Sequence, residues 1–279
     1  MSAVLFHSTD AAWLPHKYAP ALPQDKPRTT KKLVVSGKKT ARFLYLCIQC
    51  HGTLTSTYMI FRIDKEPIAF PDPRLGDPDG LFAVGGDLCV DRLLLAYSNG
   101  IFPWYSFRDS SEPMWYCPMQ RFVIFPEEIH VSHSMRTFFN RNGSRYTCTI
   151  DADFDAVIAA CSQLRIDQEG AWLGTDMTKA YTELHRQGFA HSVEVWDESD
   201  GTLAGGLYGV GIGACFMGES MFSLMPNGSK VALIHLARFM AANGGRMIDC
   251  QMETPHLKSM GGRHIGYDEY MRILREGME

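Results

Sequence analysis

The chain has 279 residues, of which 46% are hydrophobic and 21% are charged, and its formal net charge is −4 at pH 7. This is the composition of an ordinary globular protein, long enough to bury a sizeable core in one large domain or two medium ones. No apolar run approaches the roughly 20 residues that a membrane-spanning helix needs, so we expect no membrane association.

The net charge conceals two segments of opposite sign. Residues 1–58 carry eight Lys and Arg residues against two Asp residues, whereas the remainder carries 19 Lys and Arg residues against 29 Asp and Glu residues. The electrostatic field of the longer segment repels phosphate. Any contact with RNA therefore requires a local basic patch.

Cysteine usage and the N-terminus indicate the cellular compartment. The eight cysteines are scattered through apolar contexts, which is typical of buried free thiols in a reducing compartment. The first residues lack the basic start, the apolar centre and the small-residue cleavage site of a secretory signal. We therefore expect a soluble cytoplasmic protein.

The N-terminal segment contains one motif that is associated with metal chemistry. Residues 47–51 read Cys-Ile-Gln-Cys-His, the pattern of covalent haem attachment. That attachment is normally completed after export, and the chain shows no export signal. We interpret the motif as a chance occurrence, with haem and zinc as the alternatives.

The next elements are predicted from the spacing of apolar residues and from helix-cap residues. A helix is predicted at residues 92–98, with Asp87 as its cap and Gly100 at its end. An aromatic stretch follows, in which each ring is most simply a core residue, although a Trp also offers a face for stacking an unpaired base. Strands are predicted at residues 121–124 and 189–196, and helices at residues 132–139, 154–161 and 178–186.

Residues 202–251 combine a strand-like and a helix-like spacing of apolar residues. In residues 202–216 the larger apolar residues are separated by Gly and Ala, and Gly costs about 1 kcal/mol at a helix position, so we expect strand with bulges or close backbone approach. Residues 231–242 repeat apolar residues at steps of three and four, which predicts a helix with Ser229 as its N-cap. A short strand is predicted at residues 246–251.

Two polar side chains end this last strand. Asp249 and Gln251 are two positions apart, so on a strand they face the same side. One interpretation is a catalytic carboxylate with an orienting amide. The alternative is that Asp249 caps the turn at residues 254–257 and that Gln251 is a solvated strand end, and spacing alone favours this alternative. No Cys, His or carboxylate grouping has ligand spacing, so we expect no metal.

Several longer motifs occur in a fixed order from about Met59 to the C-terminus. They read GLFAVGGDL, LLLAYSNGIFPWYS, EGAWL, AYTELHRQGFAHSVEVW, GGLYGV, GESMFS, NGSK, DCQ and TPHLKSMGG. In this order they closely resemble the leucyl/phenylalanyl-tRNA–protein transferase family. The resemblance leaves only residues 1–58 outside it, and long motifs in a fixed order are a specific signal.

The resemblance implies an aminoacyltransferase. Such an enzyme moves Leu or Phe, and less readily Met, from aminoacyl-tRNA to the N-terminal Arg or Lys of an acceptor protein, which marks that protein for degradation in the N-degron pathway. The reaction is aminolysis of an ester, and a free α-amine with a pKa near ~8 is already partly nucleophilic at neutral pH. No metal, cofactor or covalent intermediate is required, and we expect a monomer.

The resemblance also assigns roles to residues. Asp249 and Gln251 match the family's catalytic pair; we expect Gln251 to orient the acceptor amine and Asp249 to stabilise its developing positive charge. Glu219 matches a carboxylate beside the aminoacyl group, with a salt bridge inside the fold as its alternative. Trp104 and Trp172 are the candidates for contact with the 3′-terminal adenosine. The apolar slot for Leu or Phe would be lined by Leu207, Phe216, Met221, Leu233 and Ile248.

The fold that the resemblance implies is α/β with mixed sheets. We expect residues 1–58 to be a disordered leader, residues 59–165 a small N-terminal domain, and residues 166–279 a C-terminal GNAT-like acyltransferase domain. The alternatives are an acyltransferase that uses acetyl-CoA, a peptidoglycan branching enzyme that uses aminoacyl-tRNA, and a catalytically inactive module that binds RNA or degrons.

A chain that begins at Met59 is expected to keep full transferase activity, because the resemblance begins there. The measurements are the yield of soluble protein and the transfer of labelled Leu from tRNA to a peptide that starts with Arg, each compared with the full chain. Loss of either on truncation contradicts the expectation.

Overall fold

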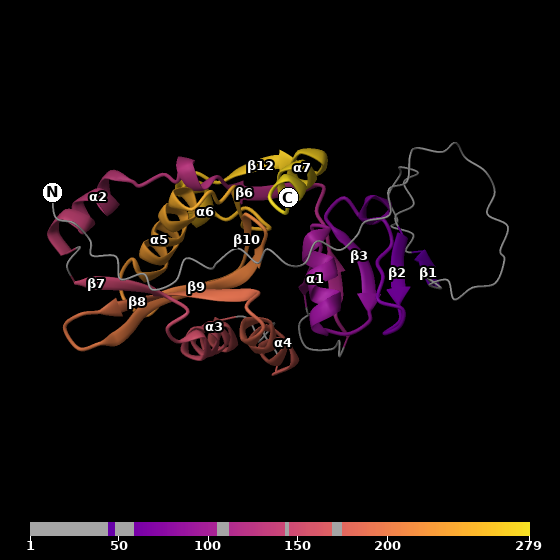
Figure 1. Ribbon diagram of the computed structural model, residues 1–279, viewed down its shortest axis with the longest axis horizontal. Coiled ribbons are helices and arrows are strands. Elements are labelled where there is room, and N and C mark those ends of the chain that lie inside the picture. The colour runs from indigo at the N-terminus through magenta and orange to yellow at the C-terminus, as the bar shows by residue number, and fades with distance from the viewer. Residues whose placement is uncertain (1–43, 48–58, 105–111, 143–144, 169–174) are drawn as a thin grey trace.

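The computed structural model describes residues 44–47, 59–104, 112–142, 145–168 and 175–279, and their strands form two sheets. The smaller sheet has the strand order β1-β2-β3-β5-β4, and the larger sheet has the order β12-β6-β11-β10-β9-β8-β7. Figure 1 shows the smaller sheet at one end of the molecule and the larger sheet filling the rest.

The smaller sheet comes from the N-terminal part of the chain. Its strands β2 and β3 run parallel, and its other neighbours are antiparallel. The helix α1 (Val90–Ser98) follows β3 and buries Leu93 and Ala96. The strands are β1 (Leu44–Cys47), β2 (Met59–Ile63), β3 (Leu81–Gly85), β4 (Phe102–Trp104) and β5 (Met114–Tyr116), and η1 (Pro73–Leu75) is a short 3₁₀ turn.

The larger sheet is antiparallel from β7 to β10, and β11 then pairs parallel with β10 and antiparallel with β6. A parallel pair needs a crossover connection, and α5 supplies it between β10 and β11. The strands are β6 (Gln120–Ile124), β7 (Tyr146–Ile150), β8 (Ala190–Asp197), β9 (Thr202–Ile212), β10 (Cys215–Ser223), β11 (Met247–Asp249) and β12 (Arg263–Gly266).

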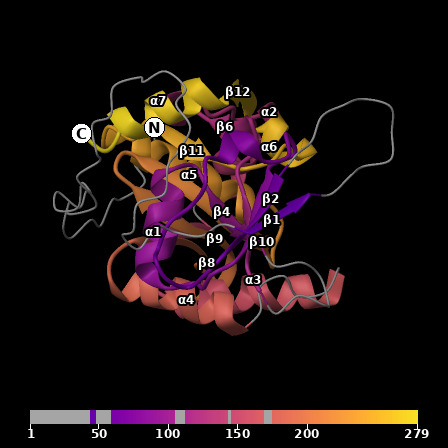
Figure 2. The same ribbon diagram turned by 90° about the vertical axis from the view of Figure 1, so that its right-hand side faces the viewer.

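Helices cover both faces of the larger sheet. Figures 1 and 2 show α3 and α4 on one face, with α5 and α6 on the other. The helices are α2 (His133–Asn142), α3 (Phe154–Gln168), α4 (Thr175–Arg186), α5 (Gly228–Ala242), α6 (Pro255–Ser259) and α7 (Tyr267–Glu276), with a 3₁₀ turn η2 (Pro126–Glu128) after β6.

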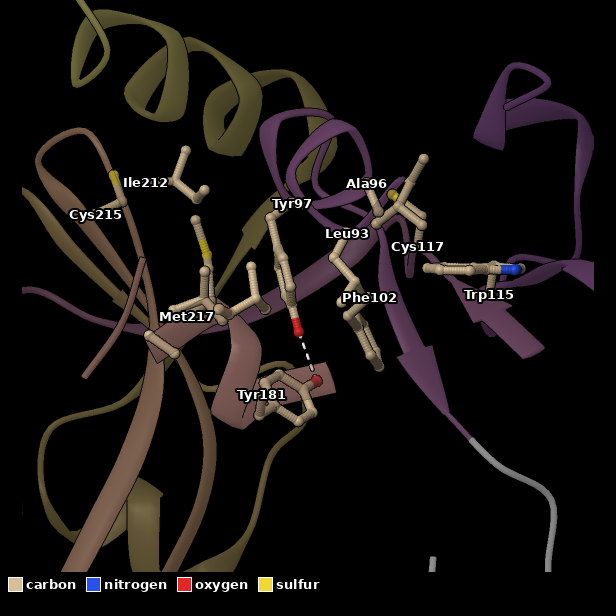
Figure 3. Packing of buried hydrophobic residues seen from close by; sticks show 14 of the residues in the cluster. Leu93, Ala96, Tyr97, Phe102, Trp115, Cys117, Tyr181, Ile212, Cys215 and Met217 are labelled. Atoms are coloured by element: carbon tan, nitrogen blue, oxygen red, sulfur yellow. Dashed lines mark hydrogen bonds between the residues drawn. The ribbon is translucent and has the colours of Figure 1, made fainter. Parts of the chain in front are cut away.

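Two buried clusters result from these layers. One lies between α5 and its face of the larger sheet and contains Leu233 and Ile248. The other lies under α3 and α4 and continues into the smaller sheet. Figure 3 shows this continuity, with Met217 of β10 near Tyr97 of α1 and Phe102 of β4. The two sheets therefore share this second cluster.

The mixed α/β fold with a small N-terminal part is confirmed, and two predicted caps are wrong. The helix α5 begins at Gly228 after Asn227, and the backbone N–H of Ser229 instead donates to Ser223 Oγ at 2.8 Å. The N-cap of α1 is Cys89, whose backbone N–H donates to Asp87 Oδ1 at 3.3 Å. Both errors shift a helix start by a few residues.

The division between the sheets also differs from the expected domain boundary near residue 165. That residue falls inside α3, which packs on the larger sheet. The sheets divide between β5 and β6, because β6 pairs with β11 and β12. β1 lies within the segment that we expected to be a disordered leader, and it pairs antiparallel with β2.

Close backbone approach explains two of the glycines in the β9–β10 hairpin. A Cβ atom on Gly205 would lie 2.6 Å from Gly228 Cα, where α5 begins, and one on Gly209 would lie 2.2 Å from Met217 O. Because both positions are Gly, the start of α5 and the strand β10 can lie this close to β9. The close approach predicted for residues 202–216 is confirmed.

Gly205→Ala is expected to lower the free energy of unfolding by about 1–3 kcal/mol, because the new methyl group must push the start of α5 away from β9. Gly211→Ala, on the same strand, is the matched control, since its Cβ would have no heavy-atom contact closer than 3.5 Å. Urea unfolding measures both, and equal stabilities would contradict the packing argument.

Candidate active site

A largely apolar hollow of about 300 Å³ opens where the two sheets meet on the α5 side. Its walls come from β4, β9, β10, α5, β11 and the segment that runs into α6. The lining residues include Phe102, Pro103, Trp104, Leu207, Phe216, Glu219, Ser220, Met221, Leu233, Ile248, Gln251, Met252, His256 and Leu257.

All five residues predicted for the apolar slot line this hollow. Strand pairing explains why they meet, because Met221 lies opposite Leu207 and Ile248 lies opposite Phe216 in the register. Leu233 reaches the same space from α5. Four of the five are less than 4% exposed, and Met221 is half-buried. The structure brings the five residues together in one hollow, and their role stays a prediction.

Glu219 lies at an irregularity of β10. The pairing register with β9 shifts between Gly218 and Ser220, which leaves Glu219 as an extra residue, as in a β-bulge. Its carboxyl group accepts hydrogen bonds from Tyr97 Oη at 2.8 Å, from Tyr181 Oη at 2.7 Å and from Gln251 Nε2 at 3.0 Å. Burial raises the pKa of Glu219 to about 7, against the lowering effect of these donors.

Asp249 and Gln251 do not share a strand face as we expected. The strand β11 ends at Asp249, and Gln251 has a left-handed backbone with φ +64°. Its backbone N–H donates to Asp249 Oδ1 at 2.8 Å, while its side chain turns to Glu219 in the hollow. Period-2 alternation holds only within a continuous strand, and this one stops too early.

Asp249 is 1% exposed and does not line the hollow. Arg121 Nε lies 3.0 Å from each of its carboxylate oxygens, and Tyr270 Oη donates to Oδ2 at 2.8 Å. Although burial opposes the charge of Arg121, the adjacent Asp249 raises the pKa of its guanidinium. Asp249 is therefore a neutralised buried partner whose contact with the hollow is indirect, through Gln251.

Arg121 also joins the two sheets. Its Nη2 donates to Gly100 O at 2.8 Å, and its guanidinium lies over the rings of Phe102 and Tyr270, 4.7 and 4.8 Å from their centroids. Gly100 and Phe102 lead into the smaller sheet, and Tyr270 belongs to α7. One side chain of β6 therefore contacts both parts of the protein.

Of the two tryptophans expected to contact the 3′ end of the tRNA, the structure describes only Trp104. Trp104, at the end of β4, lines the hollow beside Phe102 and Pro103, and its ring lies 5.5 Å from that of Tyr116. Trp172 lies outside the described residues. The motif at residues 47–51 falls mostly outside them as well, since only Cys47 belongs to β1.

Four residues that contact Glu219 or Asp249 were not predicted from sequence. Tyr97 and Tyr181 fit the apolar face of a helix, and nothing local shows that their hydroxyls meet at 2.7 Å (Figure 3). Arg121 and Tyr270 lie far from Asp249 in the sequence. An Arg beside the apolar run of residues 122–125 was the one available signal, because a buried Arg needs a partner.

Within the described ranges, no group of three or more His, Cys, Asp or Glu side chains is placed to hold a metal ion. In the same part of the chain, the helices are all too short or too polar to cross a membrane. The hollow instead offers an apolar wall with one carboxyl and one amide group. That arrangement suits a ligand with an apolar side chain and an adjacent polar centre.

Two family models match consecutive parts of the chain. The model described as leucyl/phenylalanyl-tRNA protein transferase matches residues 123–275, and the model described as the N-terminal domain of that protein matches residues 86–119. The two matches divide close to the division between the sheets, which falls between β5 and β6.

Curated relatives carry the same name. The leucyl/phenylalanyl-tRNA–protein transferase of Chromohalobacter salexigens is 50% identical over 210 residues, which cover 74% of this chain and 79% of that protein. The one of Desulforapulum autotrophicum is 46% identical over 221 residues, which cover 79% and 93% of the two chains.

Two matched solved structures are far less similar. A GCN5-related N-acetyltransferase from Sphaerobacter thermophilus is 14% identical with a TM-score of 0.33, and the match covers 69% of this chain and 60% of that one. L-PGS from Bacillus licheniformis is 13% identical with a TM-score of 0.36, over 62% and 54%.

Arg121→Met is expected to lower the free energy of unfolding by about 3–5 kcal/mol, because it leaves the Asp249 carboxylate buried without its cation. Arg263→Met is the matched control on the neighbouring strand, since its ion pair with Glu128 is about half exposed and solvent-exposed pairs contribute little to stability. Urea unfolding compares them, and similar losses would show that the buried pair is not a special constraint.

Proposed function

The chain belongs to the leucyl/phenylalanyl-tRNA–protein transferase family and is an aminoacyltransferase, and we propose that it moves Leu or Phe, and less readily Met, to the N-terminal Arg or Lys of acceptor proteins. The observation that supports the proposal is the apolar hollow whose wall carries Glu219 and Gln251 side by side. The modified proteins would be marked for degradation in the cytoplasm, with the enzyme acting as a monomer.

The apolar slot suits the donor side chain. Leu207, Phe216 and Ile248 are held in paired strands, so the wall near the reacting end is rigid. Met221 is half-buried and flexible, which suits a pocket that accepts the different shapes of Leu, Phe and Met. Side chains branched at Cβ would collide with the rigid strand wall, where there is least room to adjust.

Glu219 is the group that we assign to the donor's α-amino group. It is the described carboxyl group that lines the hollow, and an ammonium ion beside it gains a charge-assisted hydrogen bond in a poorly solvated place. Trp104, which also lines the hollow, would stack on the 3′-terminal adenosine that carries the amino acid.

Gln251 is the group that we assign to the acceptor amine. Its Nε2 donates to Glu219, so its carbonyl oxygen remains the end that accepts an N–H from the attacking amine. An amide is too weak a base to keep that proton, so Gln251 orients the nucleophile, and orientation alone supplies several kcal/mol. Asp249 acts through Gln251 by fixing its backbone, because Arg121 already neutralises the Asp249 carboxylate.

The test is transfer of labelled Leu from Leu-tRNA to a peptide that starts with Arg. We expect transfer with Leu-tRNA and Phe-tRNA, little with Ile-tRNA, and little to a peptide that starts with Ala. Gln251→Ala should reduce kcat by about 100-fold, because the amine loses its orientation.

Arg246→Ala is the control, since its ion pair with Glu276 lies on the surface away from the hollow. Label in an Ala-starting peptide at the same rate would contradict the proposed acceptor. Absence of label in every peptide would contradict the proposed reaction, and full activity of the Gln251 variant would remove Gln251 from the mechanism.

A further inference from the structure

Three oxygen-bearing side chains form a closed ring beside the hollow. Tyr97 Oη lies 2.7 Å from Tyr181 Oη and 2.8 Å from Glu219 Oε1, and Tyr181 Oη lies 2.7 Å from Glu219 Oε2. The side chains come from α1, α4 and β10, and each residue is at most 8% exposed. The ring therefore connects three elements in a place that excludes water.

Counting protons shows that the ring has two states. Three short oxygen–oxygen contacts require three O–H donors, and each tyrosine hydroxyl supplies one. The third proton must come from the Glu219 carboxyl group, which in this state donates to one tyrosine and accepts from the other, whereas the ionised carboxylate accepts from both. The closed ring is therefore the protonated, uncharged state of Glu219, and the ionised state keeps both tyrosine donors but leaves the contact between the two hydroxyls without a proton.

The groups around the ring favour the uncharged state when the hollow is empty. Tyr208 of β9 and the Asp249 carboxylate of β11 face the ring, and Arg121 forms its ion pair with Asp249. Burial, with a smaller contribution from Asp249, raises the pKa of Glu219 to about 7. Within the described part of the chain no cation forms an ion pair with Glu219, so a carboxylate here would be a costly buried charge.

We propose that Tyr97 and Tyr181 are positioning residues that hold Glu219 as a neutral acid in the empty site and as a carboxylate once the donor's α-ammonium group arrives. This rests on the proposed function, in which Glu219 receives that group. On binding, the O–H bond of the Glu219 carboxyl breaks and its proton goes to bulk water. The carboxylate then accepts from the ammonium ion, both tyrosines and Gln251.

The arrangement makes the site selective for an unblocked donor. The ammonium ion supplies the positive charge that makes ionisation of Glu219 favourable, and an N-acylated aminoacyl-tRNA cannot supply it. The two tyrosines stabilise the carboxylate more than the acid, because hydrogen bonds to a charged acceptor are roughly twice as strong as neutral ones. Removal of either hydroxyl should therefore raise the pH at which the ionised state becomes available.

The test compares equilibrium binding of Leu-tRNA and N-acetyl-Leu-tRNA without an acceptor, between about pH 6 and pH 8, where the carboxyl group of Glu219 and the donor amine titrate. The ratio of the two Kd values isolates the ammonium group, because the rest of the tRNA is shared. In the wild type we expect Leu-tRNA to be favoured above about pH 7, and we expect its advantage to fall about tenfold per pH unit below that.

In Tyr97→Phe and in Tyr181→Phe, the pH below which the preference for Leu-tRNA over N-acetyl-Leu-tRNA declines should be about one pH unit higher. At pH 7 the Kd ratio should therefore favour Leu-tRNA about tenfold less than in the wild type. Glu219→Gln should leave a small, pH-independent ratio. Tyr146→Phe is the matched control, since that hydroxyl donates to Pro226 O on the surface, and its ratio should equal that of the wild type at every pH.

Unchanged binding of N-acetyl-Leu-tRNA shows that a tyrosine variant is folded, and it separates loss of the ring from loss of structure. A wild-type ratio that does not vary with pH would overturn the proposal. The same holds if the ratio varies but neither tyrosine variant displaces it. Transfer of Leu to an Arg-starting peptide, measured on the same wild-type preparation, reports the proposed function separately.

Discussion

The buried ion pair between Arg121 and Asp249 is the constraint on which the site depends. Its partners come from parts of the chain that are far apart: Gly100 and Phe102 after α1, Tyr270 on α7, and Gln251 after β11. A carboxylate that is 1% exposed cannot leave its cation without a large cost in free energy. The pair therefore fixes the relative positions of the two sheets and, through one backbone hydrogen bond, the left-handed conformation of Gln251.

Two neighbouring residues of strand β11 point to opposite faces of the larger sheet. Ile248 points into the hollow, where it completes the apolar wall with Phe216, and Asp249 points to the junction with the smaller sheet. Alternation along a strand places these neighbours on opposite faces. The chain then leaves the strand, and this departure lets the side chain of Gln251 return to the hollow on the same side as Ile248.

The hollow combines a rigid apolar wall with a carboxyl group whose charge depends on its surroundings. The irregularity in β10 turns Glu219 toward Tyr97 and Tyr181, so the polar centre of the site is built from three elements of the two parts of the protein. The same burial that makes the wall suitable for an apolar side chain raises the pKa of Glu219. Burial is thus the common physical cause of the apolar wall and of the raised pKa of Glu219.

The sequence by itself determined the periodic elements and, through the family resemblance, the five residues that line the apolar wall of the hollow. The elements β9, β10, α5 and β11 follow from strand and helix periods, which are local properties of the chain. Only the tertiary structure decided that Asp249 faces away from the slot, that Arg121 neutralises it, and that Tyr97 and Tyr181 meet at Glu219. These facts depend on contacts between residues 38 to 128 positions apart. Local period carries no information about which buried polar groups become partners, because that choice is made by packing.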